Sequence, residues 1–430
     1  MKNWLTKVKR DPDGYLLALL VFLLPFERIP SYKFAGITLR LSLLAAALVI
    51  VRATWIYLQN RGLKLSFTVK SLLAFLLWLV IITPVSINLT RGAEVTVFTF
   101  FTAFTALGIT VLLRREHLNL LLRSLLLSAT MVGVFGLYQY FGNVLGLGAK
   151  FTGIQDRYSY QLFGFPRIQA TSLEPLYFAA YLLLPLSIII SAYSLGQLSR
   201  RWLWLLWLLG TDLFLTVSRG GNLAFVIMLS AFLTVSLFSK WSFRRLATIV
   251  LIVIISYGCA LLLISKLNHP PQGVGKGKGG LASYSQQIQT TGLEGGGDER
   301  AQARKSALVI FKQHPLIGIG PGNYGPYIQH NVKPVSGWVI VNNETLELLA
   351  ETGIIGFFLF MVFAASLFVM GARAVVIEKD PLSRAWLLGL LGFLLAMAIQ
   401  YQTFSTLFIV QFWVAIGLLL ATSGLNKSKT

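Results

Sequence analysis

Long apolar runs follow one another along most of this sequence, separated by short polar segments. Each run covers roughly 18–25 residues, the length that an α-helix needs to cross about 30 Å of hydrocarbon. The pattern predicts about twelve membrane-spanning helices. Their expected limits lie near residues 14–30, 34–51, 69–88, 95–113, 117–140, 173–195, 202–217, 221–239, 246–266, 344–370, 383–400 and 402–422. Because lipid offers no partner to backbone N–H and C=O groups, the predicted fold class is an all-α polytopic membrane protein.

Composition supports this interpretation. The 430 residues are 55% hydrophobic and only 12% charged, with a mean hydropathy of +0.70, whereas about a quarter of the residues in soluble domains are charged. The net charge of +21 is spread over short loops between the predicted spans. No soluble basic stretch is interleaved with aromatic residues, so the sequence does not predict nucleic-acid binding.

The placement of lysine and arginine predicts the orientation in the membrane. If the N-terminus is cytoplasmic, the tails and short loops on that side hold more than half of the 37 basic residues. Basic residues in short loops are retained on the cytoplasmic side. The sequence therefore predicts a multi-pass protein in the lipid bilayer with both termini in the cytoplasm.

Two predicted outside segments are long, residues 141–172 and 267–343. The second divides the chain into three expected parts. These are residues 1–266 with nine spans, residues 267–343 as a large extracytoplasmic loop with an amphipathic helix, and residues 344–430 with three further spans. The first half of the loop is rich in Gly, Ser and Gln, which is typical of a linker. A lid over a site is the alternative.

The second half of this loop contains DERAQARKSALVIFKQH, which predicts a helix over about 299–313. Asp298 is its expected N-cap, and Pro315 follows its end. Arg300 and Arg304 fall on its apolar face, so we expect both to point at the protein body. That face is completed by Ala303, Ala307, Leu308, Ile310 and Phe311. Since a helix dipole disfavours cations in the first turn, the two arginines predict a negative partner, either an acidic side chain or a bound anion.

Two more arginines lie at the predicted outer edge of the membrane. Arg219 belongs to the turn TVSRGGN, where a charge is expensive unless it is used, and Asp212 is the alternative partner on the same helix face. Arg167 stands in FPRIQATSLEP, where a snorkelling surface side chain is the alternative. The guanidinium fork matches phosphate oxygens. Together with Arg300 and Arg304, these residues predict a cradle for a lipid diphosphate at the outer leaflet.

Acidic residues gather at the same predicted edge. Glu344, Glu347 and Glu351 share one face of the helix that NNETLELLAETGIIGF predicts. Carboxylates in a membrane span are functional candidates, and one of them could serve as a general base. The alternative, favoured for Glu351, is that they hold arginines in place. The glycine-rich GIGPGNYG, residues 318–325, predicts a tight turn rather than a phosphate loop, because a nucleotide loop requires a strand before it and a helix after it.

The sequence predicts no metal and no cofactor. The four histidines show no metal-ligand spacing, and the single cysteine, Cys259, falls in a predicted span. No DxD-like motif stands in an exposed position. We therefore expect metal-independent chemistry.

In this order, these pieces resemble the bacterial O-antigen ligase and O-antigen polymerase superfamily. The resemblance covers about residues 165–360 and lies in FPRIQATSLEP, LTVSRGG, DERAQARKSALVIFKQHPLIGIGPGNYG and NNETLELLAETGIIGF. It implies a GT-C-like, inverting glycosyltransferase of surface polysaccharide assembly in the bacterial inner membrane. The implied donor is a glycan on undecaprenyl diphosphate. The implied acceptor is the lipid A–core sugar in ligases, or another lipid-linked glycan in polymerases.

The resemblance also implies roles for individual residues. The arginine of SRGG is Arg219, and the arginine fifteen residues before the HP-type proline is Arg300. Both are implied to bind and neutralise the diphosphate leaving group, with Arg167 and Arg304 assisting.

The general base is where the sequence departs from the family pattern. Ligases typically carry a histidine before the asparagine that opens the tenth span, whereas here Asn342 precedes Asn343. Because asparagine is no base near neutral pH, the candidates for base or acceptor binding are Glu344, Glu347 and His330. A polymerase and a ligase for another polysaccharide are therefore equally open.

Two other classes of protein are alternatives. A polysaccharide or lipid-linked glycan transporter, or flippase, tends to show repeated halves and helices broken near mid-membrane. The sequence shows no such repeat, and its unusual charges gather at the outer edge instead. A non-catalytic assembly scaffold would leave the arginines scattered.

Overall fold

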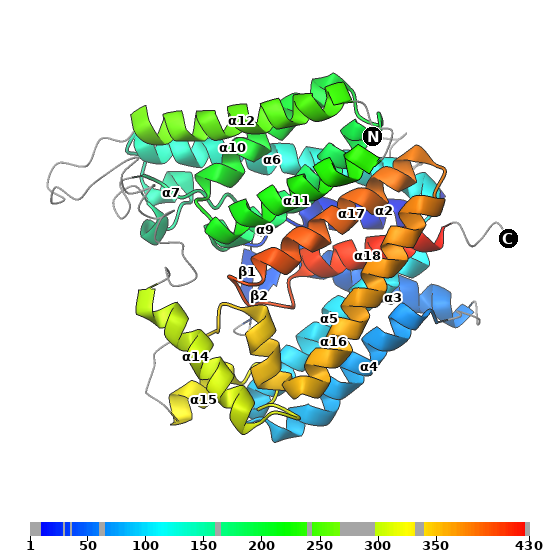
Figure 1. Ribbon diagram of the computed structural model, residues 1–430, viewed down its shortest axis with the longest axis vertical. Coiled ribbons are helices and arrows are strands. Elements are labelled where there is room, and N and C mark those ends of the chain that lie inside the picture. Colours follow the sequence, from blue (N-terminus) through cyan, green and yellow to red (C-terminus); the bar gives the residue numbers. More distant parts are fainter. Residues whose placement is uncertain are drawn as a thin grey trace, which may run out of the picture. The chain divides into compact units, whose positions relative to one another are not determined.

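The computed structural model describes residues 10–28, 31–34, 37–59, 65–159, 165–238, 243–266, 297–331 and 339–425. Helices dominate these ranges (Figure 1). The α-helices are α2 (Pro12–Leu23), α3 (Leu41–Gln59), α4 (Phe67–Ile82), α5 (Leu89–Leu112), α6 (Leu118–Val144), α7 (Ala149–Thr152), α9 (Pro175–Ser194), α10 (Leu203–Leu215), α11 (Arg219–Phe238), α12 (Phe243–Lys266), α14 (Gly297–Gln313), α15 (Tyr324–Asn331), α16 (Glu344–Ile377), α17 (Pro381–Gln400) and α18 (Val410–Gly424). Short 3-10 turns lie at Thr83–Val85, Arg115–His117, Asp156–Tyr158 and Arg200–Trp202.

The prediction of a multi-pass membrane protein is confirmed. Among the described residues, nine helices are long and apolar enough to cross a membrane. The apolar helices α2, α10 and α18 are shorter, with 12, 13 and 15 residues. The count of twelve spans, the GT-C-like arrangement and the division at residues 267 and 343 stay predictions, and residues 267–296 lie outside the described part of the chain.

Two predicted spans begin later in the structure. Phe34 and residues 37–40 belong to two antiparallel strands, β1 (Ser31–Phe34) and β2 (Ile37–Arg40), so the second helix starts only at Leu41. The alternation of Ile37 and Leu39 with Thr38 and Arg40 is the period of a strand. The two strands also make the all-α class inexact. The last span was expected from residue 402, but α18 begins only at Val410. Residues 402–405 include the polar side chains Gln402, Thr403 and Ser405.

The chain divides into two compact units. Unit 1 comprises residues 1–48, 113–295 and 378–397. Its most enclosed span is α9, where 89% of the span window is buried. The hydroxyl groups of Ser187 and Ser191 on α9 donate to the carbonyl oxygens of Gly389 and Ala385 on α17. Such small residues let helix backbones approach closely in a membrane, where van der Waals contact replaces the hydrophobic effect.

Unit 2 comprises residues 49–112, 296–377 and 398–430. Within it α5 packs on α18, α4 packs on α16, and both α14 and α15 lie against α16 (Figure 1). Close helix contact again depends on small residues, because a Cβ atom at Gly417 would lie 2.7 Å from the Ala106 carbonyl oxygen. The soluble side of this unit has its own small core, formed by Ala307, Ile310, Ile319, Tyr324, Ile328, Val341 and Ala350.

Helix α16 is broken near its start. Gly353 has φ 64° and ψ −174°, so residues 344–352 and 354–377 are separate helical segments. Segment 315–320 fills the break with backbone hydrogen bonds in both directions. These run from Ile319 N to Ala350 O (3.1 Å), Gly320 N to Glu351 O (2.9 Å), Ile354 N to Pro315 O (2.8 Å) and Ile355 N to Leu316 O (3.5 Å). The groups that the break releases from the helix are therefore paired again.

We predict that Gly353→Ala destabilises the protein. Only glycine adopts this backbone conformation without strain, and a Cβ atom there would lie 2.2 Å from the Leu316 carbonyl oxygen. The expected loss is at least about 1–3 kcal/mol, measured as a lower apparent unfolding temperature in detergent. The control is Gly258→Ala in α12, where the Cβ atom would meet nothing within 4 Å. An equal effect of both substitutions would show that the break does not depend on Gly353.

Candidate functional site

Two asparagines begin the segment that carries the glutamates. Asn343 caps α16, since its Oδ1 accepts from Leu346 N at 3.0 Å. Its own N–H donates to Ser405 Oγ at 2.8 Å, and its Nδ2 donates to the Gln402 carbonyl oxygen at 3.2 Å. Asn342 is half-buried with φ 56°, a left-handed conformation that asparagine adopts more readily than most residues. Asn343 therefore holds the start of α16 in its place, and Asn342 provides the backbone turn before it.

Glu351 binds the glycine-rich turn of unit 2. Its Oε2 accepts from Gly322 N at 2.7 Å and its Oε1 accepts from Tyr324 N at 2.9 Å. Positive φ angles occur at Gly318, Gly320 and Gly322. The predicted tight turn is thus confirmed, although a helix, α15, does follow it. A carboxylate of the protein occupies the two N–H donors that a phosphate would need, so Glu351 has a structural role.

The other two glutamates are less fully engaged. Glu347 is half-buried, and its Oε2 accepts from Val341 N at 2.9 Å. Glu344 is 7% exposed, and its Oε2 is a buried atom that has no hydrogen-bond partner in the part of the chain that the structure describes. Because a buried polar atom normally has a partner, Glu344 Oε2 is a position where a ligand or a proton can be held.

Arg91 is the residue of this cluster that sequence reasoning missed. It lies in the first turn of α5, where its side chain is 17% exposed and its Nη1 is 3.5 Å from Glu94 Oε2. It also lies within electrostatic range of Glu347 and Glu351. A Cβ atom at Gly322 would be 3.4 Å from its Nε. The available signal was the segment LTRGAE, which places an Arg-Gly pair at the outer start of a span, as SRGG does.

The helix predicted over 299–313 is confirmed as α14. Ala307 and Ile310 are buried in the small core of unit 2, whereas Leu308 is 43% exposed. Arg304 is half-buried, as expected, but Arg300 is exposed. The buried face of α14 is therefore narrower than predicted, and the first turn of α14 extends beyond the small core of unit 2.

Helix α15 is held against α14 by a tyrosine. Tyr324 Oη donates to the Ala303 carbonyl oxygen at 3.0 Å. Burial raises the pKa of Tyr324 to about 12, so the hydroxyl group remains a donor at any physiological pH. His330, at the other end of α15, is exposed, and its Nδ1 is 3.3 Å from Asn331 Oδ1. No contact in the described structure connects His330 to the three glutamates.

The remaining two candidate arginines lie in unit 1. Arg219 is the first residue of α11 and is half-buried. Arg167 holds the turn just before it, because its Nε donates to the Thr216 carbonyl oxygen at 3.2 Å and its Nη2 to that of Val217 at 3.4 Å. Val217 has φ 51°, so the turn is strained and needs such support. The structure thus brings Arg167 to the SRGG turn, whereas a cradle of all four arginines stays a prediction.

The proposed pair of Arg219 with Asp212 is not formed. Asp212 is fully buried, and neither of its carboxylate oxygens has a hydrogen-bond partner among the described residues. The carboxylate lies against α6, where a Cβ atom at Gly136 would be 3.1 Å from Oδ2. A separation of seven residues placed the two side chains on one face, but α10 ends at Leu215, so the helical spacing does not extend to Arg219.

Buried and half-buried glutamates at the start of a membrane span, together with the adjacent Arg91, form a polar centre within unit 2 of this multi-pass membrane protein. The arginine-bearing turn at Arg219 belongs to unit 1. Residues 204–361 match the family model described as O-antigen ligase. The match runs from α10 to the first part of α16 and includes Arg219, Arg300 and the three glutamates. The match covers less than half of the chain and supports its membership of the O-antigen ligase superfamily. No curated protein matches the sequence.

We predict that Glu351→Gln loosens the glycine-rich turn. An amide carries one acceptor oxygen and places N–H donors against one of the two backbone N–H groups, and hydrogen bonds to charged groups contribute about 1.5–3 kcal/mol. Hydrogen exchange at Gly322 and Tyr324 should become faster, measured by mass spectrometry of peptides from 316–331. The control is Glu94→Gln, because Glu94 is 60% exposed. Unchanged exchange in the Glu351 variant would remove its structural role.

Proposed function

We propose that this protein transfers a glycan from undecaprenyl diphosphate to a sugar hydroxyl of an acceptor glycan or glycolipid on the outer side of the bacterial inner membrane. The observation that carries the proposal is the O-antigen ligase match over residues 204–361. The match supports a function of ligase or polymerase type in surface polysaccharide assembly. The donor, the acceptor and the residue roles are the finer part of the proposal.

The proposed reaction is a single displacement without a metal. The acceptor hydroxyl oxygen forms a bond to the anomeric carbon, while the bond from that carbon to the diphosphate oxygen breaks. The bonding electron pair leaves with the diphosphate, and the hydroxyl proton passes to a carboxylate of the protein. Two needs follow, a base beside the acceptor and positive charge beside the leaving group.

We assign the base to the pair Glu344 and Glu347. Glu351 is excluded from this role because both of its oxygens accept backbone N–H groups. Glu347 is less buried than Glu344, so it is the carboxylate that an acceptor hydroxyl can reach. Glu344 lies one helical turn before it, with an oxygen that lacks a partner among the described residues. Asn342, Asn343 and His330 are proposed only to bind the acceptor.

We assign the binding of the diphosphate leaving group to arginines. Arg219 and Arg300 are proposed to bind the diphosphate, with Arg167 and Arg304 in support. Arg300 is exposed in the first turn of α14. Arg167 supports Arg219 by holding the carbonyl oxygens of the preceding turn. A guanidinium group presents paired donors to phosphate oxygens and keeps its charge at every relevant pH.

The broken helix α16 does not favour the transporter alternative. Transporters place such breaks near mid-membrane, where unwound backbone binds the cargo. Here the break at Gly353 leaves residues 354–377 as an apolar segment, about 36 Å long at 1.5 Å per residue. That segment suffices to cross the hydrocarbon by itself. The backbone groups at the break are occupied by segment 315–320 and are not available to a cargo.

The direct test is transfer by the purified protein in detergent micelles. The donor would be lipid-linked glycan extracted from a strain that lacks the gene. In micelles there is no second compartment, so a flippase would form no new glycosidic bond. We expect a transferred product with the wild-type protein, and we expect Arg219→Ala, Arg300→Ala and Glu347→Gln each to reduce the rate about 10²–10³-fold, the usual loss for one group that stabilises the transition state.

Matched controls keep this test specific. Lys305→Ala removes an exposed charge from α14, and Arg157→Ala removes an exposed charge from the predicted outer loop. Both should retain activity. Absence of product with folded wild-type protein and extracted donor would contradict the proposal.

A double variant tests whether two arginines bind the same diphosphate. If Arg219 and Arg300 act on one leaving group, their combined loss should be smaller than the product of the two single losses. Independent, multiplying effects would assign them to different ligands.

A gel of the glycans from the strain that lacks the gene separates the two reaction types. Accumulated single repeat units would indicate a polymerase, and accumulated long chains on the carrier lipid would indicate a ligase.

A further inference from the structure

A polar cavity lies at the predicted cytoplasmic end of unit 1, apart from the residues of the proposed reaction. It has a volume of about 440 Å³ and is lined by Tyr193, Gly196, Leu198, Ser199, Arg200, Arg244, Arg245 and Thr248. Three elements surround it, the end of α9, the 3-10 turn Arg200–Trp202 and the start of α12. Basic residues in short cytoplasmic loops explain why arginines are present here, but not how their side chains are arranged.

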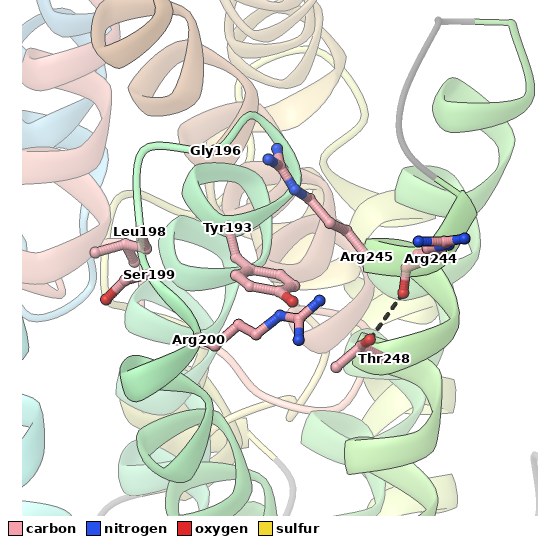
Figure 2. Close-up of a pocket in the computed structure, with 8 residues that line it drawn as sticks. All are labelled: Tyr193, Gly196, Leu198, Ser199, Arg200, Arg244, Arg245 and Thr248. Atoms are coloured by element: carbon pink, nitrogen blue, oxygen red, sulfur yellow. Dashed lines mark hydrogen bonds between the residues drawn. The ribbon is translucent and has the colours of Figure 1, made fainter.

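Two guanidinium groups border this cavity. Figure 2 shows the guanidinium group of Arg200 beside the ring of Tyr193 and directed toward Thr248, while that of Arg245 lies at Gly196. In the same view, the side chain of Arg244 is directed to the other side. Arg200 and Arg245 are therefore the two arginines whose charges face the cavity.

Among the described residues, no acidic side chain lines this cavity. None of the lining residues is Asp or Glu, and residues 195–202 and 243–248 contain neither. Arg200 forms no ion pair or side-chain hydrogen bond with any residue that the structure describes. Arg245 Nη1 donates to the Ser194 carbonyl oxygen at 3.1 Å, which uses one of its five N–H groups and caps the end of α9.

The uncharged part of the cavity also favours an anion. The first-turn N–H groups of α12, a helix of 24 residues, have no partner within the helix itself and carry partial positive charge. Tyr193 and Ser199 add hydroxyl groups to the lining, whereas Thr248 Oγ1 donates to the Arg244 carbonyl oxygen at 2.8 Å (Figure 2). Arginine forks, a helix start and hydroxyl donors around one space are the groups that bind phosphate.

The surroundings indicate that this phosphate belongs to a lipid. Phe243 is 80% exposed at the start of α12, and Trp204, two residues after the 3-10 turn, is 47% exposed on α10. Further along α12, the side chains of Leu251, Ile254 and Leu262 are all more than half exposed. Only 22% of the α12 span window is buried, the lowest value among the nine candidate spans. An apolar face that begins directly at a phosphate-binding cavity suits acyl chains joined to a headgroup.

We propose that this cavity binds the phosphate of an anionic phospholipid from the predicted cytoplasmic leaflet. Arg200 and Arg245 bind the headgroup, and the exposed face of α12 contacts its acyl chains. Basic pockets between membrane helices on the cytoplasmic side bind anionic headgroups in this way. The site is independent of glycan transfer and stands whether or not that function is correct.

The test is native mass spectrometry of the full-length protein, released from detergent and titrated with dioleoyl phosphatidylglycerol, dioleoyl phosphatidylcholine or inorganic phosphate. We expect the wild-type protein to retain phosphatidylglycerol in preference to phosphatidylcholine. Arg200→Gln combined with Arg245→Gln should weaken this binding about 30-fold, which corresponds to about 1 kcal/mol for each lost charge. The control, Arg123→Gln with Arg201→Gln, removes two exposed charges from the same predicted side without touching the cavity.

Each other outcome overturns the proposal. Equal weakening in the control variant would mean that overall charge, not this cavity, attracts the lipid. Displacement of phosphatidylglycerol by inorganic phosphate at equal concentration would assign the cavity to a free anion. Because Arg245 also caps α9, Arg200→Gln is measured alone as well. Arg200→Gln loses no side-chain contact of the described structure, so this single variant should fold. A headgroup site would be refuted if its affinity for phosphatidylglycerol were unchanged and binding were lost only in a double variant that is unfolded.

Discussion

A helix that enters a membrane cannot leave backbone groups unpaired, and this constraint determines the outer end of unit 2. Helix α16 stops being helical at Gly353, where four backbone groups would otherwise be exposed to lipid or buried without partners. Segment 315–320 meets them with hydrogen bonds in both directions. The position of the glycine-rich turn, the helix α15 that follows it, and the helix α14 before it all depend on this exchange. Without the break there would be no place for the glycine-rich turn, and Glu351 would have no N–H groups from which to accept hydrogen bonds.

The same exchange separates three glutamates that look equivalent in the sequence. Their spacing places them on one helix face, and that much the periodicity correctly predicts. Glu351 stands two residues before the break, so the turn that fills the break reaches its carboxylate. Glu347 and Glu344 lie one and two turns further away, where only the segment before α16 and the polar residues near Ser405 approach. This is why the proposed base is assigned to the two glutamates that the turn does not use.

Local patterns predicted local structure well and long-range contacts poorly. The existence and the end of α14 follow from an apolar stripe and Pro315, both within one segment, and the structure agrees. The N-cap prediction for Asp298 was wrong, because α14 already begins at Gly297. Arg91 escaped attention because its relation to Glu347 and Glu351 joins residues more than 250 positions apart, and no periodicity reports such a contact. The predicted pairing of Asp212 with Arg219 was wrong for the opposite reason. A spacing rule was extended past the end of α10, whereas packing turns its carboxylate toward Gly136 on α6.

The arginines show why counting charges says little about function. The net charge of +21 fits the predicted orientation in the membrane, which requires no further role for most of the basic residues. What distinguishes an arginine is its surroundings. Arg157 is paired with Glu174 at 3.1 Å in water and adds little. Arg167 spends its donors on the carbonyl oxygens of a strained turn, which makes it a support for its neighbour Arg219. Arg200 faces a cavity without an acid beside it. Arg200 is itself exposed, so its charge needs no partner inside the protein, and the cavity that it lines can take a negative charge from outside the chain.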